Sequence, residues 1–130
     1  MTYSKTSRDI RVTVIPEFVQ SESRVEQGRY VFAYHVTIEN LGSETVRLIN
    51  RHWVVISSGR QIADVKGEGV VGDQPVLEQG GEYRYSSWTI IADPSGSMHG
   101  EYTFLSESGH FFDVEIPQFD LVHEASLVVH

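Results

Sequence analysis

The chain has no cysteine among its 130 residues. Thiol nucleophiles, thiolate zinc sites and disulfides are therefore excluded, and the composition fits a reducing compartment. Long apolar runs are also missing, since the longest, Tyr30–Tyr34, has only five residues, whereas a membrane helix needs about 20 residues. The first residues, Met-Thr-Tyr-Ser-Lys-Thr, lack the apolar stretch of a secretory signal. We expect a cytoplasmic protein that does not insert into a membrane.

Positive charge is scarce as well. Ten Lys and Arg stand against 18 Asp and Glu, for a formal net charge of −8, and this opposes binding that depends on neutralising many phosphates. We expect no nucleic-acid partner. With 40% hydrophobic residues, the length favours a single domain over residues 1–130, with a core over about 8–121 and a C-terminal tail over 122–130. Apolar residues within 119–130 suit a final strand, a docked tail or a subunit contact, so a homodimer is left open.

No apolar period of 3.6 residues persists over three turns, whereas period-two alternation is common. In Tyr30–Ile38 the aromatic and aliphatic residues fall on one face, and His35, Thr37 and Glu39 fall on the other. Seven strands are predicted on this basis, at Ile10–Val14, Tyr30–Ile38, Val46–Ser57, Gln61–Lys66, Glu82–Ile90, Gly100–Leu105 and Phe111–Ile116. Because no helices are available to connect parallel strands, the fold predicted is all-β, an antiparallel β-sandwich of about seven strands.

The most conspicuous motif is Gly67-Glu68-Gly69-Val70-Val71-Gly72, which has the G-x-G-x-x-G spacing of dinucleotide enzymes. Pro75 follows three residues later, so the helix that such a phosphate site needs has no room to form. Two interpretations stay open: a plain connection between strands, or an exposed recognition loop with Val70 and Val71 as its apolar tip. The candidate binding loop comprises Gly67, Gly69, Val70, Val71, Gly72, Gln74 and Pro75.

Signs of catalysis or metal binding are weak. The six histidines show no His-x-His or His-x-x-x-His spacing, and no cofactor is expected. Gly96–Gly100 resembles a nucleophile elbow but has Met98 where the serine would be. We therefore predict no catalytic residues and no enzyme activity. Alternation sends Tyr83 and Tyr85 to one face of their strand and Trp88 to the other, and the two tryptophans suit either a core or an interface role.

Taken together, these motifs closely resemble the ApaG family. The segments that carry the resemblance are Tyr30–Tyr34, Ile38–Asn40, Arg51–Trp53, Gly67–Pro75, Tyr85–Ser87, Gly96–Tyr102 and Phe112–Phe119. The resemblance implies an immunoglobulin-like or fibronectin type III-like sandwich. It also implies a link to cobalt resistance and to cobalt/magnesium efflux, without a settled biochemical activity. Related domains in eukaryotic F-box proteins and in a protein that interacts with DNA polymerase delta imply protein binding.

The leading hypothesis is a non-catalytic protein-interaction module that uses the Gly67–Pro75 loop to contact a protein partner of unknown identity. Two alternatives belong to other classes. One is direct binding of Co²⁺ or Mg²⁺, which the acidic charge and the histidines suggest. The other is recognition of pyrophosphate or a nucleotide by the glycine loop.

Overall fold

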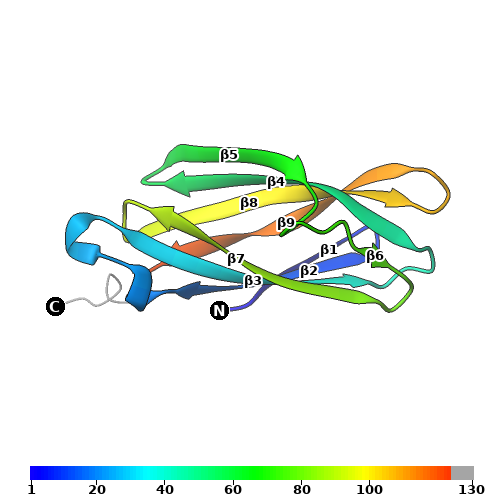
Figure 1. Ribbon diagram of the computed structural model, residues 1–130, viewed down its shortest axis with the longest axis horizontal. Coiled ribbons are helices and arrows are strands. Elements are labelled where there is room, and N and C mark those ends of the chain that lie inside the picture. The colour runs from blue at the N-terminus through cyan, green and yellow to red at the C-terminus, as the bar shows by residue number, and fades with distance from the viewer. Residues whose placement is uncertain (124–130) are drawn as a thin grey trace.

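The computed structural model, which describes residues 1–123, consists almost entirely of strands (Figure 1). In chain order the elements are β1 (Tyr3–Ser7), β2 (Ile10–Phe18), the 3₁₀ turns η1 (Gln20–Glu22) and η2 (Val25–Gln27), β3 (Tyr30–Asn40), β4 (Val46–Ser57), β5 (Arg60–Glu68), β6 (Val76–Leu77), β7 (Glu82–Ile91), β8 (Ser95–Ser106) and β9 (Phe111–Val122). All strand pairs are antiparallel. No helix in the described part of the chain is long and apolar enough to cross a membrane.

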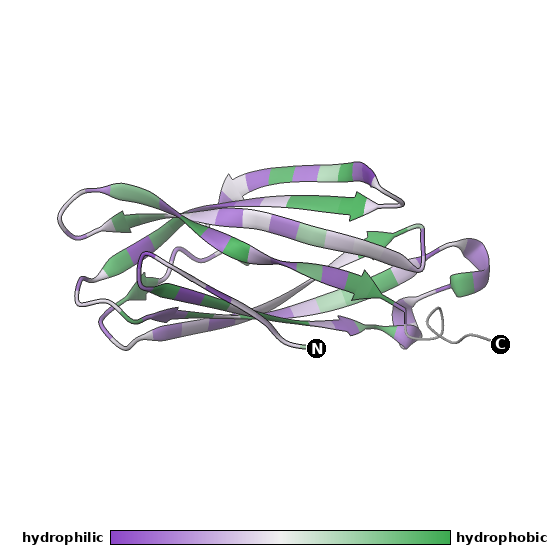
Figure 2. Ribbon diagram, turned by 180° about the vertical axis from the view of Figure 1, so that it is seen from behind, coloured by the Kyte–Doolittle hydropathy of each residue, from purple (hydrophilic) through white to green (hydrophobic). Residues whose placement is uncertain are grey.

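The strands form two sheets that pack face to face. One sheet has the order β1-β2-β3-β7, and the other has the order β5-β4-β8-β9, with β6 paired to the beginning of β4. Hydrophobic and hydrophilic residues alternate along the strands (Figure 2), so each sheet turns one apolar face to the other. The core between them includes Phe32, Tyr102, Phe104 and Phe119, each at most 1% exposed.

The two long sides of this sandwich are closed to different degrees. On one side β1 and β2 pack against β9, and the ring of Tyr3 lies 6.1 Å from that of Phe119. On the other side lie β7 and β5, which like β1 and β9 each have a single paired neighbour within residues 1–123, but which pack less closely against each other than β1 does against β9. The second side therefore presents two free strand edges to solvent.

The predicted all-β sandwich is confirmed, and each of the seven predicted strands is present. Two further strands were not predicted. β1 has only polar residues after Tyr3, so it lacks the alternation that marks a half-buried strand. β6 has only two residues, which is too short for any periodicity. Of the predicted tail, residues 122 and 123 are described, and residues 124–130 lie outside the described part.

Candidate functional site

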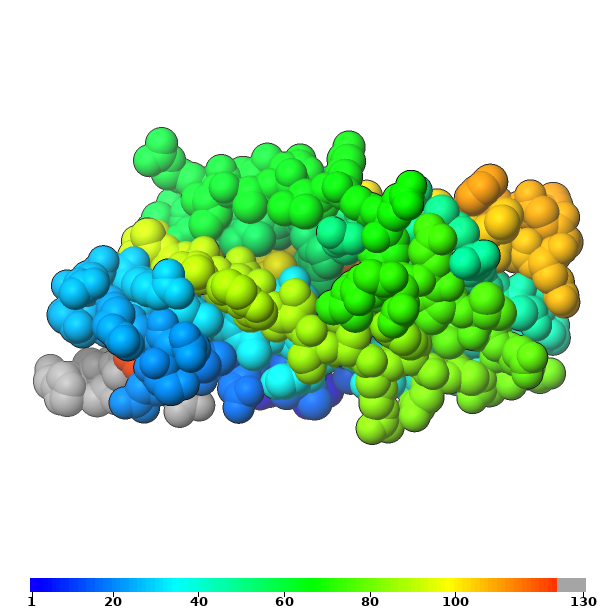
Figure 3. All heavy atoms as spheres, viewed as in Figure 1, coloured from blue at the N-terminus to red at the C-terminus, as the bar shows by residue number. Residues whose placement is uncertain are grey.

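The open side of the sandwich contains a cleft of about 320 Å³ between the two sheets. We call it the edge cleft. Its lining includes Arg51 and Trp53 of β4, Val65 of β5, Tyr85 and Trp88 of β7, and Val71 of the glycine loop. Figure 3 faces this side and shows deeper atoms between β5 and β7. The predicted binding loop thus borders a recess instead of standing apart on the surface.

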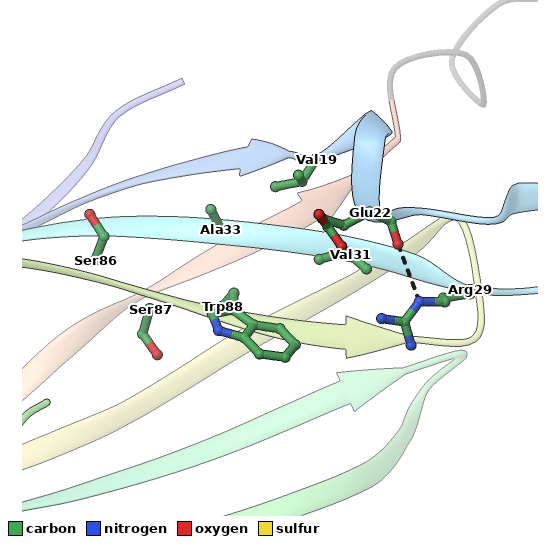
Figure 4. Close-up of a pocket in the computed structure, with 8 residues that line it drawn as sticks. All are labelled: Val19, Glu22, Arg29, Val31, Ala33, Ser86, Ser87 and Trp88. Carbon is green, nitrogen blue, oxygen red and sulfur yellow. Dashed lines mark hydrogen bonds between the residues drawn. The ribbon is translucent and has the colours of Figure 1, made fainter.

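Trp88 is the most exposed of the large apolar residues that border the cleft, with 62% of its surface exposed. It also lines a second hollow, of about 390 Å³, on the outer face of the β1-β2-β3-β7 sheet. Figure 4 shows this hollow, where the indole lies near Ala33 and Val31 and where Arg29 donates a 3.2 Å hydrogen bond to the carbonyl oxygen of Glu22. The prediction that Trp88 lies on the opposite face of β7 from Tyr83 and Tyr85 agrees with the burial pattern of that strand.

The glycine loop contains a tight turn in place of a helix. Val70 and Asp73 exchange two backbone hydrogen bonds of 2.8 and 2.9 Å, and the two residues between them, Val71 and Gly72, both have positive φ angles, 44° and 86°. This is the conformation of a type I′ turn, which favours Asn-Gly. A β-branched residue such as Val71 is strained at positive φ. The expectation that no helix follows this motif is confirmed for the described residues.

The two valines of the loop have different environments. Val71 is 56% exposed and forms an apolar tip, as predicted, but Val70 is only 1% exposed and belongs to the core. The expectation that both valines form the tip is therefore wrong for Val70. The turn reverses the chain between them, so that only one of two adjacent apolar residues faces outward.

The glycines of the motif make room for neighbouring groups. A Cβ atom on Gly67 would lie 2.8 Å from Nη2 of Arg51, and one on Gly69 would lie 2.1 Å from the carbonyl oxygen of Asp73. The amides of Gly69, Val70 and Asp73 already donate to backbone carbonyl oxygens. Those three amides are therefore not available to a phosphate, which argues against the pyrophosphate alternative.

Arg51 is held by this loop. Its Nη1 donates to the carbonyl oxygens of Glu68, at 2.9 Å, and of Gly69, at 3.0 Å. Two other predicted loop residues are hydrogen-bonded to β4. The side-chain amide of Gln74 donates to the carbonyl oxygen of Ile49, and the carbonyl oxygen of Pro75 accepts from the backbone N–H of Leu48. The motif therefore supports an arginine at the mouth of the edge cleft, which sequence spacing did not reveal.

Behind the cleft lies a pair of buried tyrosine hydroxyls. Tyr85 and Tyr102 are hydrogen-bonded to each other, and burial raises the pKa of both phenols. Burial also raises the pKa of Tyr34, whose hydroxyl lies near Ser87 and Arg51. These phenols stay neutral at physiological pH, so they offer polar contacts without negative charge.

A histidine on the outer face of the other sheet bridges two carboxylates. Nδ1 of His52 lies 2.6 Å from Glu101, and Nε2 lies 2.7 Å from Asp64, so the ring links β4 to both neighbouring strands. The hydrogen bond with Glu101, assisted by that with Asp64, raises the pKa of His52. Within residues 1–123 no group of three or more His, Asp or Glu side chains is arranged to hold a metal ion.

A second histidine links three strands of the first sheet. Nδ1 of His35 lies 2.7 Å from the Ser86 hydroxyl, and Nε2 lies 3.1 Å from Glu17. Local sequence patterns do not predict this grouping of a serine, a histidine and a carboxylate, because its members come from β7, β3 and β2. Acyl transfer also needs N–H donors that converge on an oxyanion, and backbone amides in the middle of a sheet lie in its plane instead of pointing onto its face. We interpret the group as a polar cross-link.

The chain is similar to the proteins of one known family. The sequence model of the ApaG domain family matches residues 20–106. The chain belongs to the ApaG family. It is 49% identical to Protein ApaG of Rhodospirillum centenum, with 92% of each chain covered, and 47% identical to Protein ApaG of Paramagnetospirillum magneticum, again with 92% of each covered.

Solved structures agree with this family assignment. A crystal structure described as the ApaA protein from Bordetella pertussis superposes with a TM-score of 0.85 at 40% identity, covering 88% of this chain and 93% of the other. The names of these ApaG relatives do not mention an enzymatic activity. Membership in the family therefore fixes the fold and leaves the biochemical role to be argued from the surface.

Proposed function

We propose that this ApaG family member is a non-catalytic protein-interaction module whose contact surface is the edge cleft together with the glycine loop. One observation carries the proposal. Val65, Val71 and Trp88 remain 45%, 56% and 62% exposed around one recess. Large apolar side chains gathered around a concave site are typical of surfaces that a partner covers.

The two free strand edges beside the cleft indicate the form of the partner. An edge strand has unpaired backbone N–H and C=O groups that an extended segment can pair with, and pockets beside it can accept alternate side chains of that segment. β7 and β5 supply such edges on either side of the cleft. An extended segment of a partner protein is therefore the ligand that this geometry favours.

The strained backbone at Val71 also supports a functional role for the glycine loop. A β-branched residue at a φ of 44° costs folding free energy that asparagine would largely avoid. Strain of this kind is often found at functional sites. On this proposal the link to cobalt and magnesium that the family resemblance implies would be indirect, through the partner. A cytoplasmic location and the oligomeric state stay predictions.

Site-specific photo-crosslinking in cells tests the proposal. A photoreactive phenylalanine analogue is introduced at Val71 or Trp88, and crosslinked peptides are identified by mass spectrometry. We expect both positions to capture the same segment of the same partner. Phe111 is the matched control position, because it is 65% exposed but lies on β9, outside the cleft.

Loss of the interaction on mutation is the second half of the test. Trp88→Ser should remove the crosslink formed from position 71, and Phe111→Ser should leave it unchanged. Capture of the same peptides from position 111, or an unchanged crosslink in Trp88→Ser, would show that the cleft is not the contact surface.

A further inference from the structure

The edge cleft contains one cation whose charge is not neutralised. Arg51 is half-buried at the cleft, and no carboxylate within residues 1–123 lies at salt-bridge distance from its guanidinium. Its hydrogen bonds go to two backbone carbonyl oxygens instead. Other arginines of the described chain also lack a salt bridge, but Arg51 is the basic residue that lines the edge cleft.

The guanidinium is fixed in place with part of its donor capacity unused. Both bonds to the loop carbonyls come from Nη1, and Nε and Nη2 have no hydrogen-bond partner in the described part of the chain. Those two atoms form an edge of the planar fork that binds a carboxylate with two parallel hydrogen bonds. Because the loop already holds the side chain, little conformational entropy remains to be lost on binding.

Gly67 explains how the guanidinium reaches this position. Gly67 pairs directly with Arg51 across the β4–β5 ladder, and a Cβ atom there would come within 2.9 Å of Cζ and Nη1. The absence of a side chain at Gly67 therefore lets the planar group lie over the strand. The first glycine of the motif thus serves an arginine instead of a phosphate.

The surroundings select the class of anion. The same cleft is bordered by the apolar residues Trp53, Val65 and Trp88, while Glu68 at the end of β5 and Asp73 in the glycine loop carry negative charge. A single guanidinium matches one carboxylate, and the nearby acids oppose the higher charge of a phosphate. Apolar residues on either side of the carboxylate would contact the cleft walls.

We propose that Arg51 is the specificity-determining residue of the edge cleft and that it binds the carboxylate of an Asp or Glu side chain in an extended, otherwise apolar segment of the partner. This inference rests on the proposed function and adds the chemistry of the partner. It predicts that an uncharged amide in place of that carboxylate binds about tenfold more weakly, as expected for a lost charge-assisted hydrogen bond.

Synthetic peptide libraries test the inference. The probes are decapeptides acetylated at the N-terminus and amidated at the C-terminus, so that the chain ends carry no charge. Three matched sublibraries have Glu, Gln or phosphoserine at a central position and random residues elsewhere. The full-length protein should retain Glu peptides with apolar neighbours, and resynthesised Glu binders should bind about tenfold more tightly than their Gln counterparts.

Variants of the protein assign the preference to Arg51. Arg51→Gln should bind Glu and Gln peptides equally while keeping the preference for apolar neighbours. Gly67→Ala displaces the guanidinium without removing its charge, so it should reduce the Glu preference too. This second variant keeps the inference testable if Arg51→Gln does not fold. Arg60→Gln is the control. Arg60 is exposed on β5, the strand that contains Gly67, and this variant should bind as wild type does.

The outcomes distinguish a failure of the Arg51 inference from a failure of the proposed function. Binding that depends on Trp88 but shows no difference between Glu and Gln overturns the role of Arg51 and leaves the proposed function intact. A stronger preference for phosphoserine overturns the carboxylate in favour of a phosphopeptide. An absence of any Trp88-dependent peptide overturns the proposed function and this inference together.

Discussion

At the scale of single residues, His52 couples stability to pH. Its hydrogen bonds with Glu101 and Asp64 raise its pKa in the folded protein, so the folded state binds the proton more tightly than the unfolded chain. The stabilisation is therefore complete below the unfolded pKa of about 6.5 and is lost as the pH rises through the raised folded value. We expect wild type to lose more unfolding free energy than His52→Gln between about pH 6 and 9, by about 1 kcal/mol or less.

Urea unfolding at several pH values measures this difference. His99→Gln is the matched control, because it removes a histidine from the adjacent strand β8 without deleting either hydrogen bond of His52. Its pH profile should follow wild type. Parallel profiles for wild type and His52→Gln would mean that the two carboxylates do not stabilise the charged imidazole.

At the scale of elements, the turn in the glycine loop predicts a stabilising substitution. Asparagine tolerates positive φ better than valine, and Asn-Gly is preferred in type I′ turns. Val71→Asn should therefore raise the unfolding free energy by about 1 kcal/mol. The same change should weaken partner binding on the proposed function, since it removes the apolar tip.

Denaturant unfolding of Val71→Asn checks the sign of this effect. Val65→Asn is the control, because Val65 is also exposed, at 45%, but lies within β5 and has no positive φ. There the loss of a β-branched residue should destabilise the protein slightly. A destabilised Val71→Asn variant would show that the valine side chain contributes more through packing than it costs through strain.

The sequence was informative about elements with an alternating pattern and uninformative about the others. The alternation in β3 predicted both its inner face and its outer face. By contrast, Val70 and Val71 are adjacent and equally apolar, and their different burial depends on a turn whose backbone conformation is unusual for valine. The contact between Arg51 and Gly67 depends on the register of β4 with β5, which composition and spacing do not specify.

At the scale of the whole molecule, the candidate site is a consequence of how the sheets meet. The glycine motif drew attention, from sequence alone, to a loop that borders the edge cleft. The edge cleft was not predictable, because Trp88, Val65 and Arg51 come from three strands whose order in the two sheets is not written in local patterns. The same holds for the polar group of Glu17, His35 and Ser86.

The unequal closure of the two sides predicts where stability resides. Phe119 is fully buried, with its ring centroid 6.1 Å from that of Tyr3 on the closed side, so Phe119→Ala should cost about 3–5 kcal/mol. Trp88 is 62% exposed on the open side, so Trp88→Ala should cost less than about 1 kcal/mol. Urea unfolding followed by far-UV circular dichroism compares the two. Equal losses would place the Trp88 ring in the core and remove it as a contact for a partner, whereas a small loss leaves its exposed surface available for binding.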